Sequence, residues 1–421
     1  MSARVSAPTT NAAGSRTMRI LLFSTLYPNV AQPQHAVFVE NRLRHLLAQG
    51  GIEARVVAPI PWFPLAGAAF GRYGVFSQAP GRETRFGIEI EHPRYPIIPK
   101  VGMSLAPLLM YAWSRPAVAR LLRAGFEFDL IDAHYAYPDG VAAAMLGRHF
   151  GKPVTITARG TDINLIPRHA LPRRMVRWAA GEAAGLVAVC QALKSAMVEL
   201  DIPADKVRVL RNGVDIEQFH PVDPATARGA LGVRAPVLLS VGGLIPRKGH
   251  DLIIRALPRL PEATLLIAGA GPMDTALRRL AADTGVGARV RFLGAVPHEA
   301  LREVYSAADV LVLASDREGW PNVLLEAMAC GTPVAATDVW GNGEVVTEPA
   351  AGRLIPTRDP ATIAASVAAL LADPPARPAT RAYAERFTWD DTSRGQIDLF
   401  RDILGDTAPC RGHGSDGAPA Q

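Results

Sequence analysis

Two acidic residues, Glu318 and Glu326, stand on either side of a predicted helix start in the segment EGWPNVLLEAMACGTPV. Pro321 followed by Asn322 is typical of a helix N-terminus, with Asn322 expected as the N-cap, and Gly331 is placed to end the helix. Two carboxylates around one helix start can accept hydrogen bonds from the hydroxyl groups of a sugar or a ribose. Taken alone, the same pair also fits a solvated surface.

The amide end of this predicted helix suits an anion. First-turn amides have no partner inside a helix and carry the positive end of its dipole. The sequence therefore predicts a diphosphate site formed by Gly319, Asn322 and Val323.

A second segment, SVGGLIPRKGHDLIIRAL, predicts a glycine-rich turn between a strand and a helix. Gly243, Arg247 and Lys248 belong to this turn, where basic side chains can neutralise a departing diphosphate. Neither a dinucleotide-binding G-x-G-x-x-G nor a Walker A motif occurs in it. On its own, Lys248 also fits a solvated loop residue. A further turn, AGAGP from Ala268, is expected to serve backbone packing.

The elements that must position these segments are short apolar runs alternating with amphipathic stretches, the pattern of parallel strands joined by crossover helices. In the first half we expect strands at 19–24, 54–59, 130–134, 154–158 and 186–189, and helices at 37–49, 140–149, 173–182 and 192–200. In the second half we expect strands at 237–241, 264–268, 289–293, 310–313 and 334–337, then helices at 361–372 and 388–404. The fold class is therefore α/β, with two Rossmann-like, doubly wound parallel sheets facing one cleft.

Two segments depart from this alternation. Between residues 59 and 116 many Pro and Gly residues predict irregular loops and a hairpin near 88–95. The Asp- and Pro-rich stretch 211–236 is the expected boundary between two domains, because 421 residues exceed one ordinary core.

Composition and charge exclude several classes. The hydrophobic share of 49% and the charged share of 20% are those of a globular chain. Cys190, Cys330 and Cys410 follow no metal-ligand or disulfide spacing and no secretory signal is visible, so the cytoplasm is the expected location. The apolar run 101–113 is interrupted by Pro107 and is too short to span a membrane.

The net charge of +6 is concentrated in the first half. Such an excess suits an anionic partner, either phospholipid headgroups or a phosphate-bearing acceptor, and equally a solvated basic face. No nucleic acid is expected as a partner.

The second half resembles glycosyltransferase family 4, the retaining enzymes with the GT-B fold. The resemblance is carried by the E-x7-E pattern of EGWPNVLLEAMACGTPV, by VGGLIPRKG, by AGAGP and by NGVD at Asn212–Asp215. It implies that Glu326 holds the donor ribose, that Glu318 contacts the transferred sugar, and that Lys248 stabilises the diphosphate leaving group.

Departures from the family pattern carry expectations of their own. Relatives often have Arg where this chain has Gly243, and we expect Arg247 to supply the missing diphosphate contact. No D-x-D sequence, with which metal-dependent GT-A enzymes hold their cation, occurs in the chain. The reaction is therefore expected to need no metal and no cofactor, with a nucleotide-diphosphate sugar as co-substrate.

The first half resembles the family's acceptor domain more loosely. IDAHYAYPDG matches the strand that ends in the family's active-site His, which nominates His134 as catalytic, although a lone His is often structural. In TARGTDIN, Arg159 stands where His is common, and Arg159, Asp162 and Asn212 are candidate cleft residues. The loop LYPNVAQPQHAVF after the first strand lacks the paired glycines of many relatives, so donor contacts are not carried over to it.

The resemblance also suggests the domain plan. We expect a disordered extension at 1–17, an acceptor-binding domain at 18–207, a nucleotide-sugar-binding domain at 208–383, a helix at 384–404 that crosses back to the first domain, and a disordered tail at 405–421.

The expected activity is retaining, metal-independent transfer of a sugar to a glycan or lipid-linked acceptor, in polysaccharide or glycolipid biosynthesis. Trp178 with Arg168, Arg173, Arg174 and Arg177 forms an amphipathic stretch that suits an anionic membrane, and hence peripheral attachment to the inner face of the plasma membrane. A solvated basic helix is an equal alternative. The competing functions are a nucleotide-sugar 2-epimerase on the same fold and a non-catalytic nucleotide-sugar-binding protein.

Overall fold

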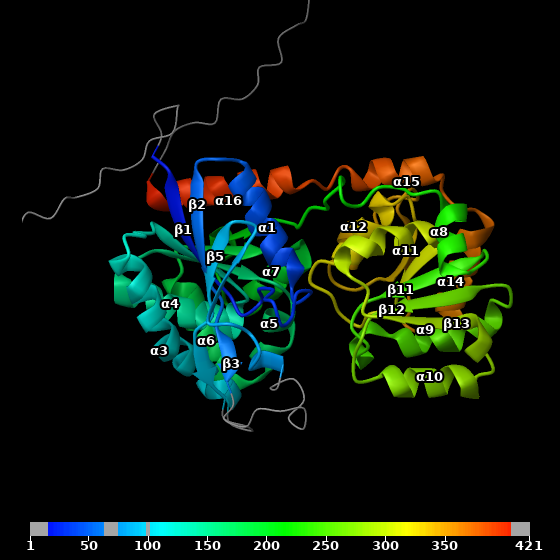
Figure 1. Cartoon of the computed structure of the whole chain (residues 1–421), viewed down its shortest axis with the longest axis horizontal. Helices are drawn as coiled ribbons and strands as arrows, with labels where there is room; N and C mark the ends of the chain where they lie inside the picture. The colour runs from blue at the N-terminus through cyan, green and yellow to red at the C-terminus, as the bar shows by residue number, and fades with distance from the viewer. Residues whose placement is uncertain (1–15, 63–74, 98–101, 406–421) are drawn as a thin grey trace, which may run out of the picture.

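Two α/β lobes, each built on its own sheet, lie side by side in the computed structural model (Figure 1). The structure describes residues 16–62, 75–97 and 102–405. Nearly all of the expected N-terminal extension and C-terminal tail, at 1–15 and 406–421, therefore lies outside the described residues. Within the described part of the chain, no helix is long and apolar enough to cross a membrane.

Within the described residues, eight strands form the sheet of the first lobe in the order β10-β9-β8-β7-β1-β2-β5-β4. The strands are β1 (Met18–Phe23), β2 (Ile52–Val57), β4 (Arg82–Arg85), β5 (Ile88–Glu91), β7 (Leu130–His134), β8 (Val154–Ala158), β9 (Gly185–Ala188) and β10 (Val207–Val209). All neighbours pair in parallel except β4 with β5. The central strands are almost wholly buried because helices cover both faces of the sheet.

Alternate side chains of these strands pack on two helical layers. The helices are α1 (Val37–Ala48), α3 (Gly102–Arg123), α4 (Val141–Phe150), α5 (Thr161–Asn164), α6 (Ala170–Glu182) and α7 (Gln191–Val198). Leu21 and Phe23 join the apolar cluster of α3, α4 and α6, whereas Ile20 and Leu22 join that of α1. This is the doubly wound arrangement that the sequence predicts.

The stretch between residues 59 and 116 is more regular than the sequence suggests. Its hairpin is β4 with β5, somewhat earlier than expected, and β3 (Ile60–Trp62) pairs in parallel with β6 (Arg94–Pro96). The prediction of loops up to residue 116 is wrong, because α3 begins at Gly102 and contains two prolines. Pro107 cannot donate to the carbonyl of Met103, and the hydroxyl of Tyr137 donates to that carbonyl instead.

In the described part of the second lobe, six parallel strands follow the order β13-β12-β11-β14-β15-β16. The strands are β11 (Val237–Val241), β12 (Thr264–Ala268), β13 (Val290–Gly294), β14 (Val310–Leu313), β15 (Val334–Thr337) and β16 (Gly352–Ile355). The helices are α8 (Pro224–Leu231), α9 (His250–Ala256), α10 (Asp274–Asp283), α11 (Leu301–Ala307), α12 (Asn322–Ala329), α13 (Asn342–Val345), α14 (Pro360–Ala372) and α15 (Arg377–Ala384). Sequence periodicity missed the short edge strand β16 and helix α15.

The last described helix, α16 (Trp389–Leu404), returns to the first lobe and lies beside α1 (Figure 1). Phe400 is fully buried in the apolar cluster that contains Ile20 and Leu22. A Cβ at Gly185 would approach Leu399 to 2.9 Å, so α16 also packs closely over β9. The chain therefore completes the first lobe with its last helix.

Candidate active site

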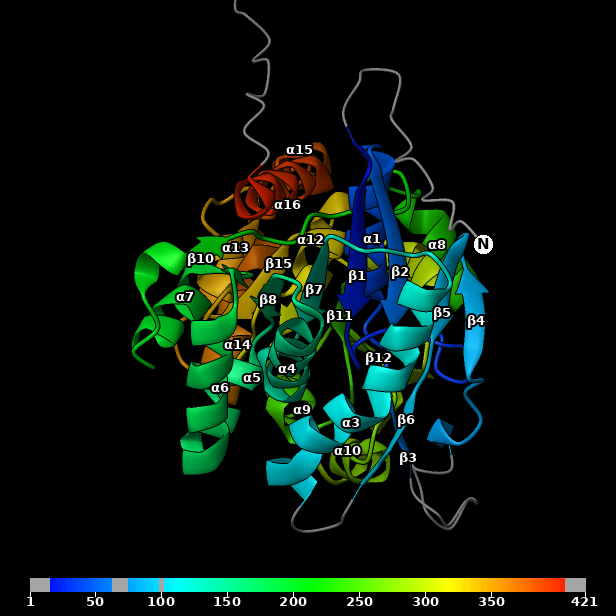
Figure 2. The ribbon, with the colours of Figure 1, turned by 90° about the vertical axis from the view of Figure 1, so that its left-hand side faces the viewer.

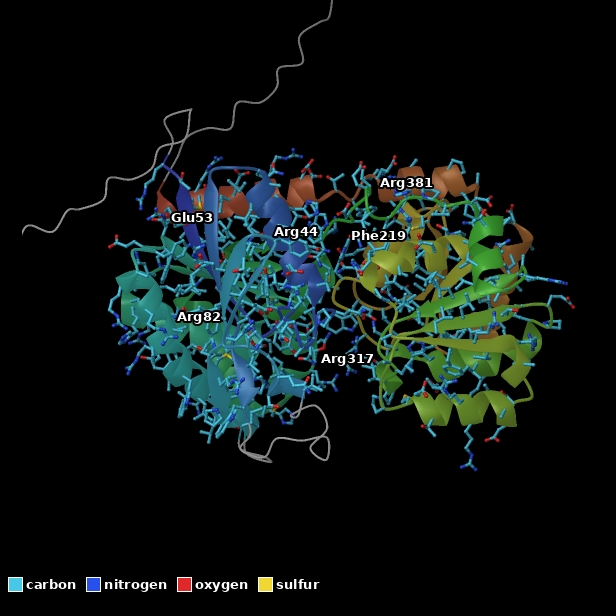
Figure 3. All side chains as sticks on the ribbon, in the orientation of Figure 1. Arg44, Glu53, Arg82, Phe219, Arg317 and Arg381 are labelled. Atoms are coloured by element: carbon cyan, nitrogen blue, oxygen red, sulfur yellow. The ribbon has the colours of Figure 1, made fainter. Side chains whose placement is uncertain are left out.

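A cavity of about 660 Å³ lies between the two lobes. Five of the candidate site residues line it from the second lobe: Gly243, Lys248, Asn322, Val323 and Glu326. Figure 3 labels another lining residue, Phe219, where the second lobe faces the first. Within the described residues, no group of three or more His, Cys, Asp or Glu side chains is arranged to hold a metal ion.

The first lobe contributes a wall that the sequence did not predict. Residues 34–38 and Asn41 line the cavity, so the loop after β1 does face it despite lacking paired glycines. Trp389, at the start of α16, lines it as well. These side chains are neutral or aromatic, and no motif distinguishes them in the sequence.

Helix α12 presents its amide end to the cavity. Pro321, not Asn322, is the N-cap, and no side chain caps this helix, so the expectation for Asn322 is wrong. Asn322 is instead the first helical residue, and its Oδ1 accepts a hydrogen bond from Nδ2 of Asn212 at 3.2 Å. The side chain is turned toward the linker between the lobes and away from its own backbone.

Glu326 is buried one turn into α12 and held from two sides. The hydroxyl of Tyr305 donates to its Oε2 at 2.7 Å, and Nε2 of His298 lies 3.1 Å from its Oε1. Burial alone would lower the pKa of His298, but the carboxylate of Glu326 outweighs it and raises that pKa. His298 also packs edge-on against Phe219, at 5.0 Å between ring centroids. Neither His298 nor Tyr305 could be predicted from the sequence, because no motif surrounds them.

Glu318 lies one contact behind the cavity wall. Nζ of Lys248 and Oγ of Ser315 each donate to its Oε1 at 2.6 Å. Nη1 of Arg247 is 3.4 Å from its Oε2 and donates to the carbonyl of Arg317 at 2.8 Å. Burial raises the pKa of Glu318, yet Lys248 and Arg247 outweigh burial and keep it below its usual range. The carboxylate is therefore ionised, and Lys248 joins it to the cavity.

The glycine-rich turn is supported from below. Nδ1 of the buried His250 is 2.9 Å from the hydroxyl of Ser240, and its Nε2 is 3.3 Å from the carbonyl of Gly243. Burial lowers the pKa of His250 to about 4, so the ring is neutral and can donate to that carbonyl. The AGAGP turn packs as expected, since a Cβ at Gly269 would lie 1.9 Å from the carbonyl of Gly242, but Ala268, Gly269 and Ala270 also line the cavity.

Gly319 lies at one of the points where the lobes touch. A Cβ at this position would lie 2.0 Å from the carbonyl oxygen of Arg159 in the first lobe. Gly319 is not among the residues that line the cavity, and the close approach of two backbones requires a glycine at this position.

His134 does not face the cavity as the sequence suggested. It is 1% exposed, its Nε2 is 3.0 Å from Oδ2 of Asp132, and its Nδ1 contacts Nη2 of Arg159. Burial lowers the pKa of His134 to about 4, so the ring is neutral. With Nε2 donating to Asp132, Nδ1 is free to accept from Arg159. In this structure His134 is thus a relay between two charged groups.

A chain of hydrogen bonds continues from Arg159 to the cavity wall through Asn212, which lies in the segment that joins the lobes. Nη1 of Arg159 donates to Oδ1 of Asn212 at 3.1 Å, and Asn212 in turn donates to Asn322. Arg159 and Asn212 therefore stand behind the cavity wall and not in the cleft itself. Asp162 is not a cleft residue either, because its buried carboxylate accepts backbone amides of Ala136 at 2.6 Å and Gly160 at 2.7 Å.

The charge of Asp132 is shared with α1 and α16. Thr155 donates to one carboxylate oxygen at 2.8 Å and Gln396 of α16 donates to the other at 2.7 Å. Nε of the fully buried Arg42 in α1 donates to Oε1 of Gln396 at 2.7 Å. Segments from both ends of the chain thus meet at one buried carboxylate.

Solved structures share this two-lobed architecture. The sucrose-phosphate synthase of Thermosynechococcus elongatus matches with a TM-score of 0.75 at 21% identity, over 93% of this chain and all of that chain. Anabaena HepE in complex with UDP matches with a TM-score of 0.69 at 21% identity, over 91% of this chain and all of that one. The fold is GT-B, two parallel-sheet lobes around one cleft.

Family models and curated relatives identify the class of enzyme. The model of glycosyl transferases group 1 matches residues 226–387, and that of Glycosyltransferase Family 4 matches residues 36–218. A D-inositol 3-phosphate glycosyltransferase of Frankia alni is 33% identical over 70% of this chain and 81% of its own length. A protein of the same name from Saccharomonospora viridis is 30% identical over 80% and 84%. The chain belongs to the family 4 glycosyltransferases and is a transferase.

Proposed function

We propose that this glycosyltransferase moves a sugar from a nucleotide-diphosphate sugar to a glycan or lipid-linked acceptor, with retention of anomeric configuration and without a metal ion. The observation that carries the proposal is the interlobe cavity, in which Lys248, Glu326 and the amide end of α12 line one space. Its volume of about 660 Å³ suits a nucleotide-diphosphate sugar, since small-molecule sites span about 300–1,000 Å³.

The second lobe offers the groups that such a donor needs. Lys248 and the positive end of α12 can stabilise the charge that develops on the departing diphosphate. Both oxygens of Glu326 already accept one hydrogen bond, and each keeps a lone pair for a ribose hydroxyl. Glu318 is proposed to meet the transferred sugar once Lys248 turns toward phosphate. HepE, which shares the fold, was solved with UDP and with UDP-glucose.

The acceptor would enter from the side of the first lobe. The wall formed by residues 34–38 and Asn41 offers neutral hydrogen-bonding groups that suit sugar hydroxyls. The name of the curated relatives adds an inositol phosphate to the glycan and lipid-linked acceptors. Which of these is used decides whether the protein serves polysaccharide or glycolipid assembly.

Donor binding is tested by thermal unfolding with UDP-, GDP- and ADP-sugars and with NAD. Ligand at about 100 times its Kd adds about 2.7 kcal/mol to the free energy of unfolding. One nucleotide-sugar class should stabilise the wild type and the control Glu348→Gln, an exposed glutamate, but not Glu326→Gln. Stabilisation by NAD alone, or equal stabilisation of Glu326→Gln, would contradict the proposal.

Product analysis then separates the competing functions. Incubation with the identified donor and either inositol 3-phosphate, a glycan primer or a polyprenyl-linked sugar should yield one glycoside with the anomeric configuration of the donor, as read by NMR. A C2-epimerised sugar formed without acceptor indicates an epimerase. Donor binding with no product from any acceptor indicates a binding protein.

Metal independence has its own test. Turnover should persist after dialysis against EDTA, because Lys248 and the α12 amides are proposed to meet the diphosphate charge. Loss of turnover that Mg²⁺ or Mn²⁺ restores would show that a cation is needed.

A further inference from the structure

The outer face of the first lobe combines exposed apolar side chains with a dense set of arginines. The helices α3, α4 and α6 lie side by side on the part of this lobe that points away from the second lobe (Figure 2). We propose that this outer face, formed by α3, α4, α6 and the turn Ile166–Arg168, docks on an anionic phospholipid surface.

Apolar exposure is concentrated on this face. Met103, Leu105, Leu108 and Trp113 of α3 and Leu171 of α6 each expose between 37% and 48% of their surface. The opposite side of α3 is buried through Met110, Val118 and Leu121 in the core of the lobe. The side of α3 that faces away from the core therefore presents apolar side chains that a bilayer interface can cover.

A hollow of about 300 Å³ opens between the three helices. It is lined by Tyr111, Met145, Arg148, His149 and Trp178. Tyr and Trp are the side chains that favour the headgroup level of a bilayer, where an apolar ring meets a wet edge. The sequence already marked Trp178, and the structure adds the aromatic and basic neighbours that surround it.

The charge of the outer face is almost entirely positive. Its described segments carry Arg115, Arg120, Arg123, Arg148, Arg168, Arg173, Arg174 and Arg177 against one acidic residue, Glu182. Three of these arginines pair with acidic groups: Arg120 with Glu91, Arg148 with Glu182 and Arg177 with Asp201. No acidic side chain of the described residues lies within ion-pair distance of Arg115, Arg168 or Arg174. Free guanidinium groups beside exposed apolar side chains complement anionic headgroups above an apolar interior.

The same features speak against a nucleic acid as the partner. Phosphate contacts by arginine would account for the charge, but exposed Leu and Met side chains add nothing to backbone binding. The proposal does not rest on donor chemistry, because membrane docking is measured without a nucleotide sugar. It deepens the lipid-linked choice of acceptor, since docking would keep the protein at the surface that carries such a substrate.

Docking is tested by co-sedimentation of the full chain with vesicles of phosphatidylglycerol and phosphatidylcholine in equal parts, and with phosphatidylcholine alone. The wild type should bind the anionic vesicles and not the neutral ones. Each basic residue near an anionic bilayer strengthens binding roughly fivefold, so Arg115→Glu/Arg168→Glu/Arg174→Glu should weaken it roughly 100-fold or more. Leu108→Gln/Trp113→Gln should weaken it roughly tenfold with no change of charge.

A matched control carries the same charge change on the second lobe, in Arg255→Glu/Arg259→Glu/Arg353→Glu, three exposed arginines. It should keep nearly all vesicle binding, and far-UV circular dichroism should show all variants folded. The proposal fails if the wild type ignores anionic vesicles, or if both triple variants lose binding equally. It also fails if the Leu108/Trp113 variant binds vesicles as the wild type does while duplex DNA competes the protein off them.

Discussion

The two lobes treat their charged groups in opposite ways. The second lobe brings Lys248 and Glu326 to the cavity wall, where a ligand can contact them. The first lobe keeps Asp132, His134 and Arg159 behind its wall, where they contact one another. A group at the wall can act on a substrate directly, whereas a group behind it acts through the position of its neighbours. The comparison predicts that substitutions at the second-lobe wall lower the reaction rate, whereas substitutions behind the first-lobe wall lower the stability of the fold.

The largest effect is expected from the first lobe. Asp132→Ala would leave the buried Arg42 and Arg159 without the carboxylate between them, a loss of about 3–5 kcal/mol in the free energy of unfolding. Urea unfolding would measure it. Asp402→Ala removes an exposed partner of Arg208 and should cost less than about 1 kcal/mol. Equal losses in the two variants would show that the buried cluster does not stabilise the lobe.

A substitution at the second-lobe wall should lower the rate of the reaction. Lys248→Ala is expected to lower kcat by about 10²–10³, the usual cost of losing one group that stabilises developing charge. Initial rates at saturating donor would measure it. Arg247→Ala sharpens the comparison, because Arg247 lies against Glu318 outside the cavity lining. An unchanged rate in Arg247→Ala would end the idea that it replaces the arginine missing at Gly243.

His134 decides whether the first lobe also takes part in proton transfer. As a neutral relay it needs one donor and one acceptor, which a glutamine amide also has. His134→Gln should therefore keep kcat within about tenfold and leave its pH profile in place, while His134→Leu should lose more of both activity and stability. A loss of about 10²–10⁴ in His134→Gln with a changed pH profile would mark a proton-transfer residue instead.

The smallest effect concerns His298 on the second-lobe wall. Because Glu326 raises its pKa in the folded protein, the pair stabilises fully below the unfolded pKa of about 6.5 and less as pH rises through the folded value. The difference in unfolding free energy between wild type and His298→Asn should thus shrink from pH ~5.5 to pH ~8.5, by less than about 1 kcal/mol. A difference that grows over this range would contradict the assignment.

Most of the central strands could be predicted because a buried parallel strand is a short, local run of mainly apolar residues. Strands β7, β8, β11, β12, β14 and β15 have the predicted bounds. The cavity residues Lys248 and Glu326 also follow from local signals, a turn and a helix start. Helix α3 did not, because the carbonyl that Pro107 leaves unpaired is satisfied by Tyr137, more than thirty residues further along the chain.

The place of His134 could not be predicted for a related reason. Its orientation depends on Arg159 and on a carboxylate that Gln396 helps to hold, and sequence spacing carries no record of these contacts. Likewise, residues 34–38 reach the cavity only because the second lobe stands opposite them. Side chains that are positioned by distant partners need the structure.

The return of α16 sets the order in which the lobes can mature during synthesis. The first lobe is translated first, yet Arg42 cannot form its hydrogen bond with Gln396 until α16 has been made. The core around Ile20 likewise lacks Phe400 until then. At 5–20 residues per second, roughly 10–40 s separate translation of β10 from that of α16. The first lobe therefore stays incomplete until the second lobe has been translated, although its own strands are made first.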